Sequence, residues 1–586
     1  MEINGLNESL IKRYSDISAY KKGEKYFKKG NILSMDLHGH TLCAMIQGDN
    51  RIASETTVMF DSGGIVEVGC STCEGANWCE HLVTSLLGVL HQPDIIKSHL
   101  SLKELLHKKK SDDLKDLILK IAENNSDMEH LFLKYLLETD SIKLENITCR
   151  ESEVIADPVP FARKTSYIIK KYEGRSETED AIAELSELVD EALEFVANCD
   201  GKSALSIMES IINSYVKQWM DLDGSMGDSA LFFEDLDMAL AKSILISDLT
   251  RDESRKYLKK IEQWQQKLDN NGIESAFVLS IASLIQGWDE PVLKRVLAGE
   301  KVSLPIRGKN VPEYASLLTA IRLEILDIQK RYQEYLYLAL HEGALFDYQM
   351  MLVKVNRPHE VLENAHKMLQ YNYQALTIAE ELRKKGYLKE AMEIARHGLV
   401  LEGASLSRLA FWLSERYEAL GDKNSALECL LIAFREAPSL NDFLRIRDLA
   451  EKDKWPDIRN RLLAELGRSA FNLSDIIDIF LHEGLINRAI KIVDKESEHY
   501  KEVLRVLDAA IKEKPEWVIK NACARAEEIL EQANSKHYNK AVTFLKKAQI
   551  AYNETKMVDL WNDYRKGLLT RHSKKPKLTA LLDKLP

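Results

Sequence analysis

CSTCEGANWCEH, residues 70–81, places three thiols and one imidazole within twelve positions near the start of the chain. These side chains converge on one tetrahedral ion if the chain turns once between the two halves, and Gly75 with Asn77 favours such a turn. The candidate ligands are Cys70, Cys73, Cys79 and His81.

Thiolates and a neutral imidazole are typical ligands of structural zinc sites, which fill all four positions of the metal. The quartet leaves no position for a water molecule, so the sequence predicts one structural Zn²⁺ ion and not a catalytic one. Binding requires deprotonated thiols, which couples metal affinity to pH and to local folding. The alternative interpretation is a group of core cysteines without a metal.

The residues around the quartet are typical of a small α+β domain. Residues 8–29 have a helical pattern, with Leu10, Ile11, Tyr14, Ile17, Tyr20 and Phe27 near one face. Four short segments rich in β-branched residues follow, separated by turn residues, and predict an antiparallel meander. They are residues 31–37, 41–48, 53–60 and 64–70. A helix is expected from Glu80 until just before Pro93.

The segment from Tyr26 to Leu90 resembles the SWIM zinc-finger family in its prokaryotic form, whose pattern is Cys-x-Cys, a variable spacer and Cys-x-His. Cys79-Glu80-His81 matches the second half, and the meander and following helix match the family's layout. Two residues instead of one separate Cys70 from Cys73, which lengthens the first half by one residue. The resemblance implies a module that binds nucleic acid or protein, and it implies no reaction.

From about residue 100 the helical period dominates, and a short step recurs within it. Glycine is followed five positions later by alanine in three windows: Gly386 and Ala391, Gly421 and Ala426, Gly484 and Ala489. The middle window, with Ala433 and Pro438, resembles a tetratricopeptide repeat. The flanking copies have Gly398 and Glu496 where the second alanine is expected. The resemblance implies an α-solenoid, and ordinary helical hairpins are the alternative.

The predicted fold is therefore mainly α, with a small N-terminal α+β zinc-binding domain followed by a long tetratricopeptide-like α-solenoid. The expected divisions are a SWIM-type domain over 1–92, a helical connector over 93–150, a helical domain over 151–330, helical repeats over 331–560 and a basic tail over 561–586.

Composition narrows the class of protein further. The chain of 586 residues has a formal net charge of −12, which argues against coating nucleic acid through global charge. The N-terminus lacks the apolar core of a signal peptide, and no apolar stretch reaches the length of a membrane span. Few, mostly scattered cysteines argue against a disulfide scaffold. We therefore expect a cytoplasmic protein that does not associate with membranes; the oligomeric state is left open.

Weaker candidate sites have simpler alternatives. A basic face on the first helical segment predicts contacts to phosphates or a partner, with Tyr26 as an aromatic platform, whereas a solvated helix face is the alternative. Its basic residues are Lys21, Lys22, Lys25, Lys28 and Lys29. We interpret His38 and His40 as residues of a hairpin turn in preference to metal ligands. We interpret the basic C-terminus as a frayed end in preference to a binding site.

Catalytic signatures are missing from the sequence: it has no phosphate-binding glycine loop, nucleophile elbow or zinc-protease pair. The leading hypothesis is a non-enzymatic adaptor that binds protein partners through the zinc module and the helical scaffold. The alternative is a nucleic-acid-binding protein that uses the zinc module and the basic helix. A third hypothesis is an accessory subunit of a separate ATPase.

Overall fold

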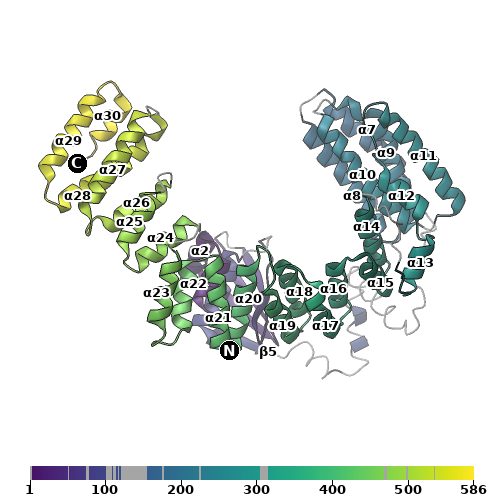
Figure 1. The fold of residues 1–586 in the computed structure, drawn as a ribbon, viewed down its shortest axis with the longest axis horizontal. Helices are drawn as coiled ribbons and strands as arrows, with labels where there is room; N and C mark the ends of the chain where they lie inside the picture. The colour runs from purple at the N-terminus through teal and green to yellow at the C-terminus, as the bar shows by residue number, and fades with distance from the viewer. Residues whose placement is uncertain are drawn as a thin grey trace. The chain divides into compact units, whose positions relative to one another are not determined.

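The computed structural model describes residues 3–49, 52–73, 78–99, 109, 114–115, 118–120, 155–174, 177–222, 226–247, 249–303, 314–466, 472–495, 499–532 and 535–585. The chain forms two compact units. Unit 1 comprises Met1–Glu104, Tyr371–Leu376 and Ala395–Pro586, and unit 2 comprises Leu105–Gln370 and Thr377–Ile394. Helices dominate both units, and one small sheet lies near the N-terminus, which confirms the predicted fold class (Figure 1).

The N-terminal sheet has the strand order β4-β3-β2-β1-β5. Its strands are β1 (Ile32–His38), β2 (Thr41–Gln47), β3 (Ala53–Asp61), β4 (Gly64–Cys70) and β5 (Ile96–His99). The first four strands form the predicted antiparallel meander. The fifth strand was not predicted; it pairs in parallel with β1, starting at Met35 opposite Ile96. Buried Leu42, Ala44 and Val58 face the core of this domain.

The helical pattern predicted over residues 8–29 is confirmed, and the structure divides it into two helices, α1 (Glu8–Tyr14) and α2 (Ile17–Lys28). Asp16 accepts a hydrogen bond from the backbone N–H of Ala19 and so begins a new helix after extended Ser15. The break changes the direction of the apolar face. Ile17, expected near one face with Leu10 and Ile11, is therefore 77% exposed, whereas those two residues are buried.

Helix α3 (Glu80–His91) is buried from His81 to Val89. It packs against the sheet and crosses α2 closely, since a Cβ at Gly23 would lie 2.6 Å from Val83. The Thr84 hydroxyl donates to the carbonyl oxygens of Gly23 (3.1 Å) and Glu80 (2.7 Å). A short 3-10 turn, η1 (Pro93–Ile95), connects α3 to β5, so the helix ends before Pro93 as predicted.

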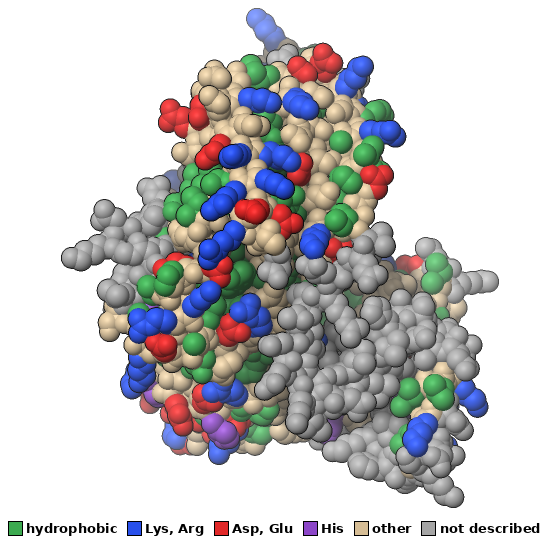
Figure 2. Space-filling model, turned by 90° about the vertical axis from the view of Figure 1, so that its right-hand side faces the viewer, with side chains coloured by type: hydrophobic (Ala, Val, Ile, Leu, Met, Phe, Trp, Pro, Cys, Tyr) green, Lys and Arg blue, Asp and Glu red, His purple; other side chains and the backbone are tan. Residues whose placement is uncertain are grey.

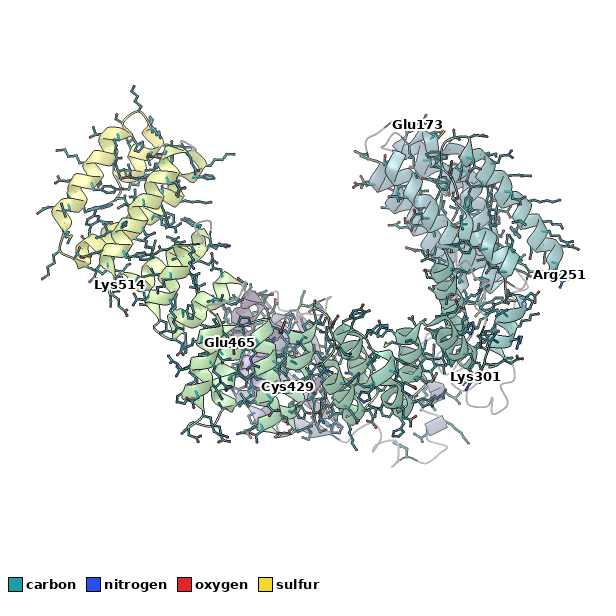
Figure 3. All side chains as sticks on the ribbon, in the orientation of Figure 1. Glu173, Arg251, Lys301, Cys429, Glu465 and Lys514 are labelled. Atoms are coloured by element: carbon teal, nitrogen blue, oxygen red, sulfur yellow. The ribbon has the colours of Figure 1, made fainter. Side chains whose placement is uncertain are left out.

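Apart from an isolated bridge between Glu173 and Leu222, the regular elements described in unit 2 are helices. Its elements are α7 (Val159–Tyr172), α8 (Thr178–Ala197), α9 (Gly201–Gln218), η2 (Trp219–Asp221), α10 (Met226–Ile246), α11 (Arg251–Asp269), α12 (Val278–Gln286), α13 (Pro291–Leu297), α14 (Ala315–Ile328), α15 (Tyr332–Glu342), α16 (Leu345–Lys354) and α17 (Pro358–Met368). Aromatic side chains fill its core, where Phe233 packs against Tyr215, Trp219 and Phe277. Helix α11 begins at Arg251, which Figure 3 labels.

Two helices, α18 (Asn372–Lys384) and α19 (Leu388–Gly398), contain residues of both units. The remaining helices of unit 1 are α20 (Leu406–Ala419), α21 (Lys423–Glu436), α22 (Leu440–Leu449), α23 (Trp455–Leu466), α24 (Leu473–His482), α25 (Ile486–Val493), α26 (Tyr500–Ala510), α27 (Pro515–Glu531), η3 (Ser535–His537), α28 (Tyr538–Glu554), α29 (Val558–Arg571) and α30 (Pro576–Leu582). Buried apolar residues from α20 to the C-terminus form one continuous cluster, as stacked helical hairpins do.

The recurring Gly-Ala step corresponds to turns between paired helices. Gly386, Gly421 and Gly484 have φ angles of +87°, +83° and +66°, a left-handed conformation that favours glycine. The alanines five positions later are all fully buried. Glycine at 398 replaces the expected alanine because a Cβ there would lie 2.5 Å from Ala375 and 2.6 Å from Leu409. Position 496 lies outside the described residues.

The C-terminal residues are not a frayed tail. Helices α29 and α30 pack against the core of unit 1 through Trp561, Leu568, Leu578 and Leu582. The Arg571 guanidinium donates to Glu527 at 3.1 Å. The contacts also divide the chain differently from the predicted linear order, since residues 1–104 group with 395–586. Most of the predicted 93–150 connector lies outside the described residues.

Candidate metal centre

Three structural elements bring the predicted ligands together. Cys70 is the last residue of β4, where it pairs with Thr56 of β3, and Cys73 follows directly after a bend at Ser71 and Thr72. Cys79 occupies the N-cap position of α3, and His81 lies in the first turn of that helix. Two ligands, Cys70 and Cys73, therefore come from the end of β4 and the residues after it, and the other two, Cys79 and His81, come from the start of α3. Gly75 and Asn77, the predicted turn residues, lie outside the described residues.

The three sulfur atoms surround one nitrogen of the imidazole. His81 Nδ1 lies 3.7 Å from Cys70 Sγ, 3.6 Å from Cys73 Sγ and 4.0 Å from Cys79 Sγ. All four ligand atoms lie within 4.8 Å of one another. No other group of three or more His, Cys, Asp or Glu side chains with this convergence occurs among the residues that the structure describes.

These separations fit a tetrahedral zinc site. Zinc–sulfur bonds of about 2.3 Å and a zinc–nitrogen bond of about 2.0 Å, at tetrahedral angles, place sulfur about 3.5 Å from nitrogen. The three observed sulfur–nitrogen distances of 3.6–4.0 Å are close to that value. Small movements of the thiols would complete the coordination sphere. The quartet is thus able to hold one metal ion, and its donor set suits zinc.

Neighbouring side chains orient the imidazole so that Nδ1 faces the sulfurs. His81 Nε2 lies 3.4 Å from the hydroxyl of buried Ser54, and the Thr72 hydroxyl donates to Ser54 Oγ at 2.8 Å. An Nε2–H donated to Ser54 leaves the Nδ1 lone pair for the metal. The ring of Tyr26 stacks on His81 with centroids 6.0 Å apart. The backbone at Gly48 also approaches Nε2, since a Cβ there would lie 3.4 Å from it.

The protonation of the free ligands follows from their surroundings. Burial lowers the pKa of His81, which favours the neutral imidazole that a metal requires. Burial raises the pKa of Cys73, and raises that of Cys79 to about 12. Burial also acts to raise the pKa of Cys70, but hydrogen bonds from Thr72 and neighbouring backbone N–H groups outweigh it and lower the pKa. A divalent cation would displace protons from these thiols.

The basic face of α2 is exposed, as both of its interpretations require. Lys22 forms an ion pair with Glu80 at 2.6 Å, beside the metal centre, and Lys28 pairs with Glu24 at 2.9 Å. The other members, Lys21, Lys25 and Lys29, are also exposed. Tyr26 is 1% exposed and packs on His81, so it provides no platform for a nucleobase. The aromatic part of the phosphate-binding hypothesis is therefore wrong.

The remaining candidates take structural roles. His38 stacks on His99 of β5, and His40 packs edge-on against Phe60, on either side of the β1–β2 turn. Cys429 is buried on α21 within unit 1 (Figure 3), and burial raises its pKa to about 11. Burial likewise raises the pKa of Cys523 to about 11. These cysteines behave as apolar core residues.

Sequence reasoning missed the groups that connect the metal centre with the helices of unit 1. Trp78, directly before Cys79, is buried and stacks on Tyr14 with centroids 5.1 Å apart. The Tyr14 hydroxyl donates to Glu415 of α20 at 3.0 Å. No local sequence signal joins residues 401 positions apart, so only the tertiary structure reveals this connection.

The sequence matches no protein-family model and no curated protein. The likeness to the SWIM family therefore rests on the residues quoted above. Among the helices that the structure describes, none combines the length and the apolar composition needed to cross a bilayer.

Proposed function

We propose that this chain is a non-enzymatic, zinc-dependent interaction protein. A SWIM-like module holds one structural Zn²⁺ ion, and the helical scaffold binds a protein partner. The convergence of three thiols on Nδ1 of buried His81 carries the proposal. Four protein ligands would fill a tetrahedral coordination sphere and leave no position for a reacting water. The ion would fold the module and take no part in a reaction.

The helical scaffold supports binding to a protein. Stacked hairpins bury one side of each helix and leave the other side for partners. In unit 1, Tyr371 and Tyr373 are 44% and 48% exposed and stack with centroids 5.9 Å apart. An isolated bridge pairs Tyr371 with Glu402, two positions after Val400, which is 81% exposed. Exposed aromatic and apolar side chains of this kind are typical of protein-binding surfaces.

Charge supports a protein partner over nucleic acid. Lys22 and Lys28 already pair with acidic neighbours, and the net charge is −12. On the face in Figure 2, basic and acidic side chains are interspersed and do not gather into one basic patch. Nucleic-acid binding through phosphates needs a surplus of exposed Lys and Arg along one surface.

The test is affinity capture with the full chain as bait, followed by cross-linking and mass spectrometry. We expect one protein to be retained at moderate salt by the wild type and lost in a Tyr371→Ser/Tyr373→Ser variant. Tyr167→Ser is the matched control, because Tyr167 is an exposed tyrosine of unit 2. Retention of nucleic acid alone, with salt-sensitive affinity that falls when Lys21, Lys22, Lys28 and Lys29 are neutralised, would contradict the proposal.

A further inference from the structure

The N-terminal domain contacts helices α20 and α22 of unit 1 through α1 residues that are more than 400 positions away from their partners in sequence (Figure 1). Ser9 donates to the side chain of Asn441 at 2.7 Å. Arg13 donates to Asp442 at 2.5 Å. Tyr14 donates to Glu415 at 3.0 Å. The residues of α1 thus form a row of polar contacts with α20 and α22, and we call this row the α1 contact.

The α1 contact is charged, and its partners on α20 and α22 are buried, whereas Tyr14 on α1 is 39% exposed. Asp442 is 2% exposed, and Glu415 and Arg416 are 7% and 6% exposed. The Arg13 guanidinium also lies over the ring of Phe411, 3.3 Å from its centroid. Charged groups held away from water depend strongly on their partners, so a small displacement of α1 weakens the whole contact.

One pair in this contact is incompletely satisfied. Arg416 donates to Glu415 Oε2 at 2.6 Å, but Glu415 Oε1 and Arg416 Nε have no hydrogen-bond partner among the described residues. Polar interfaces between two parts of one chain resemble transient protein–protein interfaces. The α1 contact therefore has the character of an interface that opens, in contrast with the apolar core beside it.

Trp78 connects the α1 contact with the metal centre. Its indole stacks on the Tyr14 ring at an interplanar angle of 23°, and its backbone N–H donates to the Tyr14 carbonyl oxygen at 3.4 Å. A single peptide bond joins Trp78 to Cys79. Binding of the Cys79 sulfur to an ion therefore restricts the position of the Trp78 indole. The indole in turn supports the Tyr14 ring, whose hydroxyl donates to Glu415.

We infer that the metal centre acts as a latch for the α1 contact. With zinc bound, Trp78 holds Tyr14 against Glu415, and the N-terminal domain covers part of α20 and α22. Loss of zinc frees Trp78, opens the contact and exposes the covered helix surface. The inference rests on the zinc site of the proposed function, and it adds that zinc occupancy regulates access to the scaffold.

Hydrogen–deuterium exchange of the full chain tests the latch, with zinc content measured on the same samples. In the zinc-loaded protein, peptides of α1 and α20 should be protected, and chelation should deprotect both. Tyr14→Phe should keep zinc yet raise the opening equilibrium of the α1 contact about tenfold, because buried Glu415 loses the donor from α1 and keeps only Arg416. Tyr20→Phe is the matched control, since the Tyr20 hydroxyl bonds Glu8 within the N-terminal domain.

The outcomes separate the two proposals. Bound zinc with α20 exchange unchanged by both chelation and Tyr14→Phe would overturn the latch and leave the zinc site intact. A chain that binds no zinc would overturn both. Exchange in α3 identifies general unfolding: Tyr14→Phe supports the latch only if α3 stays protected while α1 and α20 open, and loss of protection in all three overturns it.

Discussion

Replacing Gly23 with alanine tests the close crossing of α2 and α3 that positions His81. A Cβ at this position would lie 2.6 Å from Cβ and Cγ1 of Val83 and 2.8 Å from the carbonyl oxygen of Glu80. Carbon atoms in contact lie about 3.5–4.0 Å apart, so the helices must separate by about 1 Å. Overpacking of this kind costs about 1–3 kcal/mol. This cost exceeds the gain of about 0.5–1 kcal/mol that alanine brings to a helix interior.

The displacement should reach the metal centre, because α3 begins directly after Cys79 and contains His81. We expect Gly23→Ala to weaken zinc affinity by about tenfold, equivalent to about 1.4 kcal/mol of the packing cost. Competition with a chromogenic chelator measures the affinity of the full chain. Hydrogen exchange in α3 reports the accompanying loss of local stability.

Gly567→Ala on α29 is the matched control. A Cβ there meets no atom within 4 Å, so the substitution should stabilise the helix by about 0.5–1 kcal/mol and leave zinc affinity unchanged. A Gly23→Ala variant that binds zinc as tightly as the wild type, with α3 equally protected, would show that the close crossing of α2 and α3 does not position His81.

Three further predictions concern helix ends and proton binding. Thr250 and Glu253 form a capping box on α11, so Thr250→Ala should cost about 1 kcal/mol, seen as faster exchange in α11; unchanged exchange would contradict this. Burial raises the pKa of Asp237, which accepts N–H bonds at the start of α12, to about 6 from 3.8. The folded chain therefore binds more protons between about pH 4 and 6, and wild type should lose up to about 3 kcal/mol relative to Asp237→Asn as pH rises through this window. Urea unfolding of α12, monitored by hydrogen exchange at about pH 4 and at about pH 6, measures the stability difference between wild type and Asp237→Asn. A stability difference that is the same at both pH values would contradict this prediction. Because zinc displaces protons from thiols such as Cys79, zinc affinity should fall on acidification, and a chelator titration showing pH-independent affinity would oppose that expectation.

The N-terminal domain was largely predictable because its signals are local. Alternating β-branched segments separated by turn residues indicated four strands, and the structure has them at nearly the same residues. The spacing of thiols and imidazole indicated one site, and the structure brings those four side chains together. Patterns of this kind depend on neighbours within a few residues, which a single sequence contains.

The unpredicted features depend on weaker or more distant interactions. Asp16 ends one helical segment by capping the next, and this short-range competition is invisible when only the apolar period is considered. Strand β5 has four residues and is defined by its pairing with β1. The ion pair of Arg13 with Asp442 joins positions 429 residues apart. Nothing in the local composition of either segment identifies the other.

Elemental analysis of the purified full chain, kept reduced and free of chelators, shows directly whether the Cys70, Cys73, Cys79 and His81 quartet binds zinc. Wild type is compared with the Cys70→Ser/Cys79→Ser double variant, and Cys429→Ser is the control because Cys429 lies in the core of unit 1. We expect about one zinc per chain in wild type and in Cys429→Ser, and none in the double variant. Wild-type protein without zinc, or a double variant that retains it, would rule out a zinc site at these four residues.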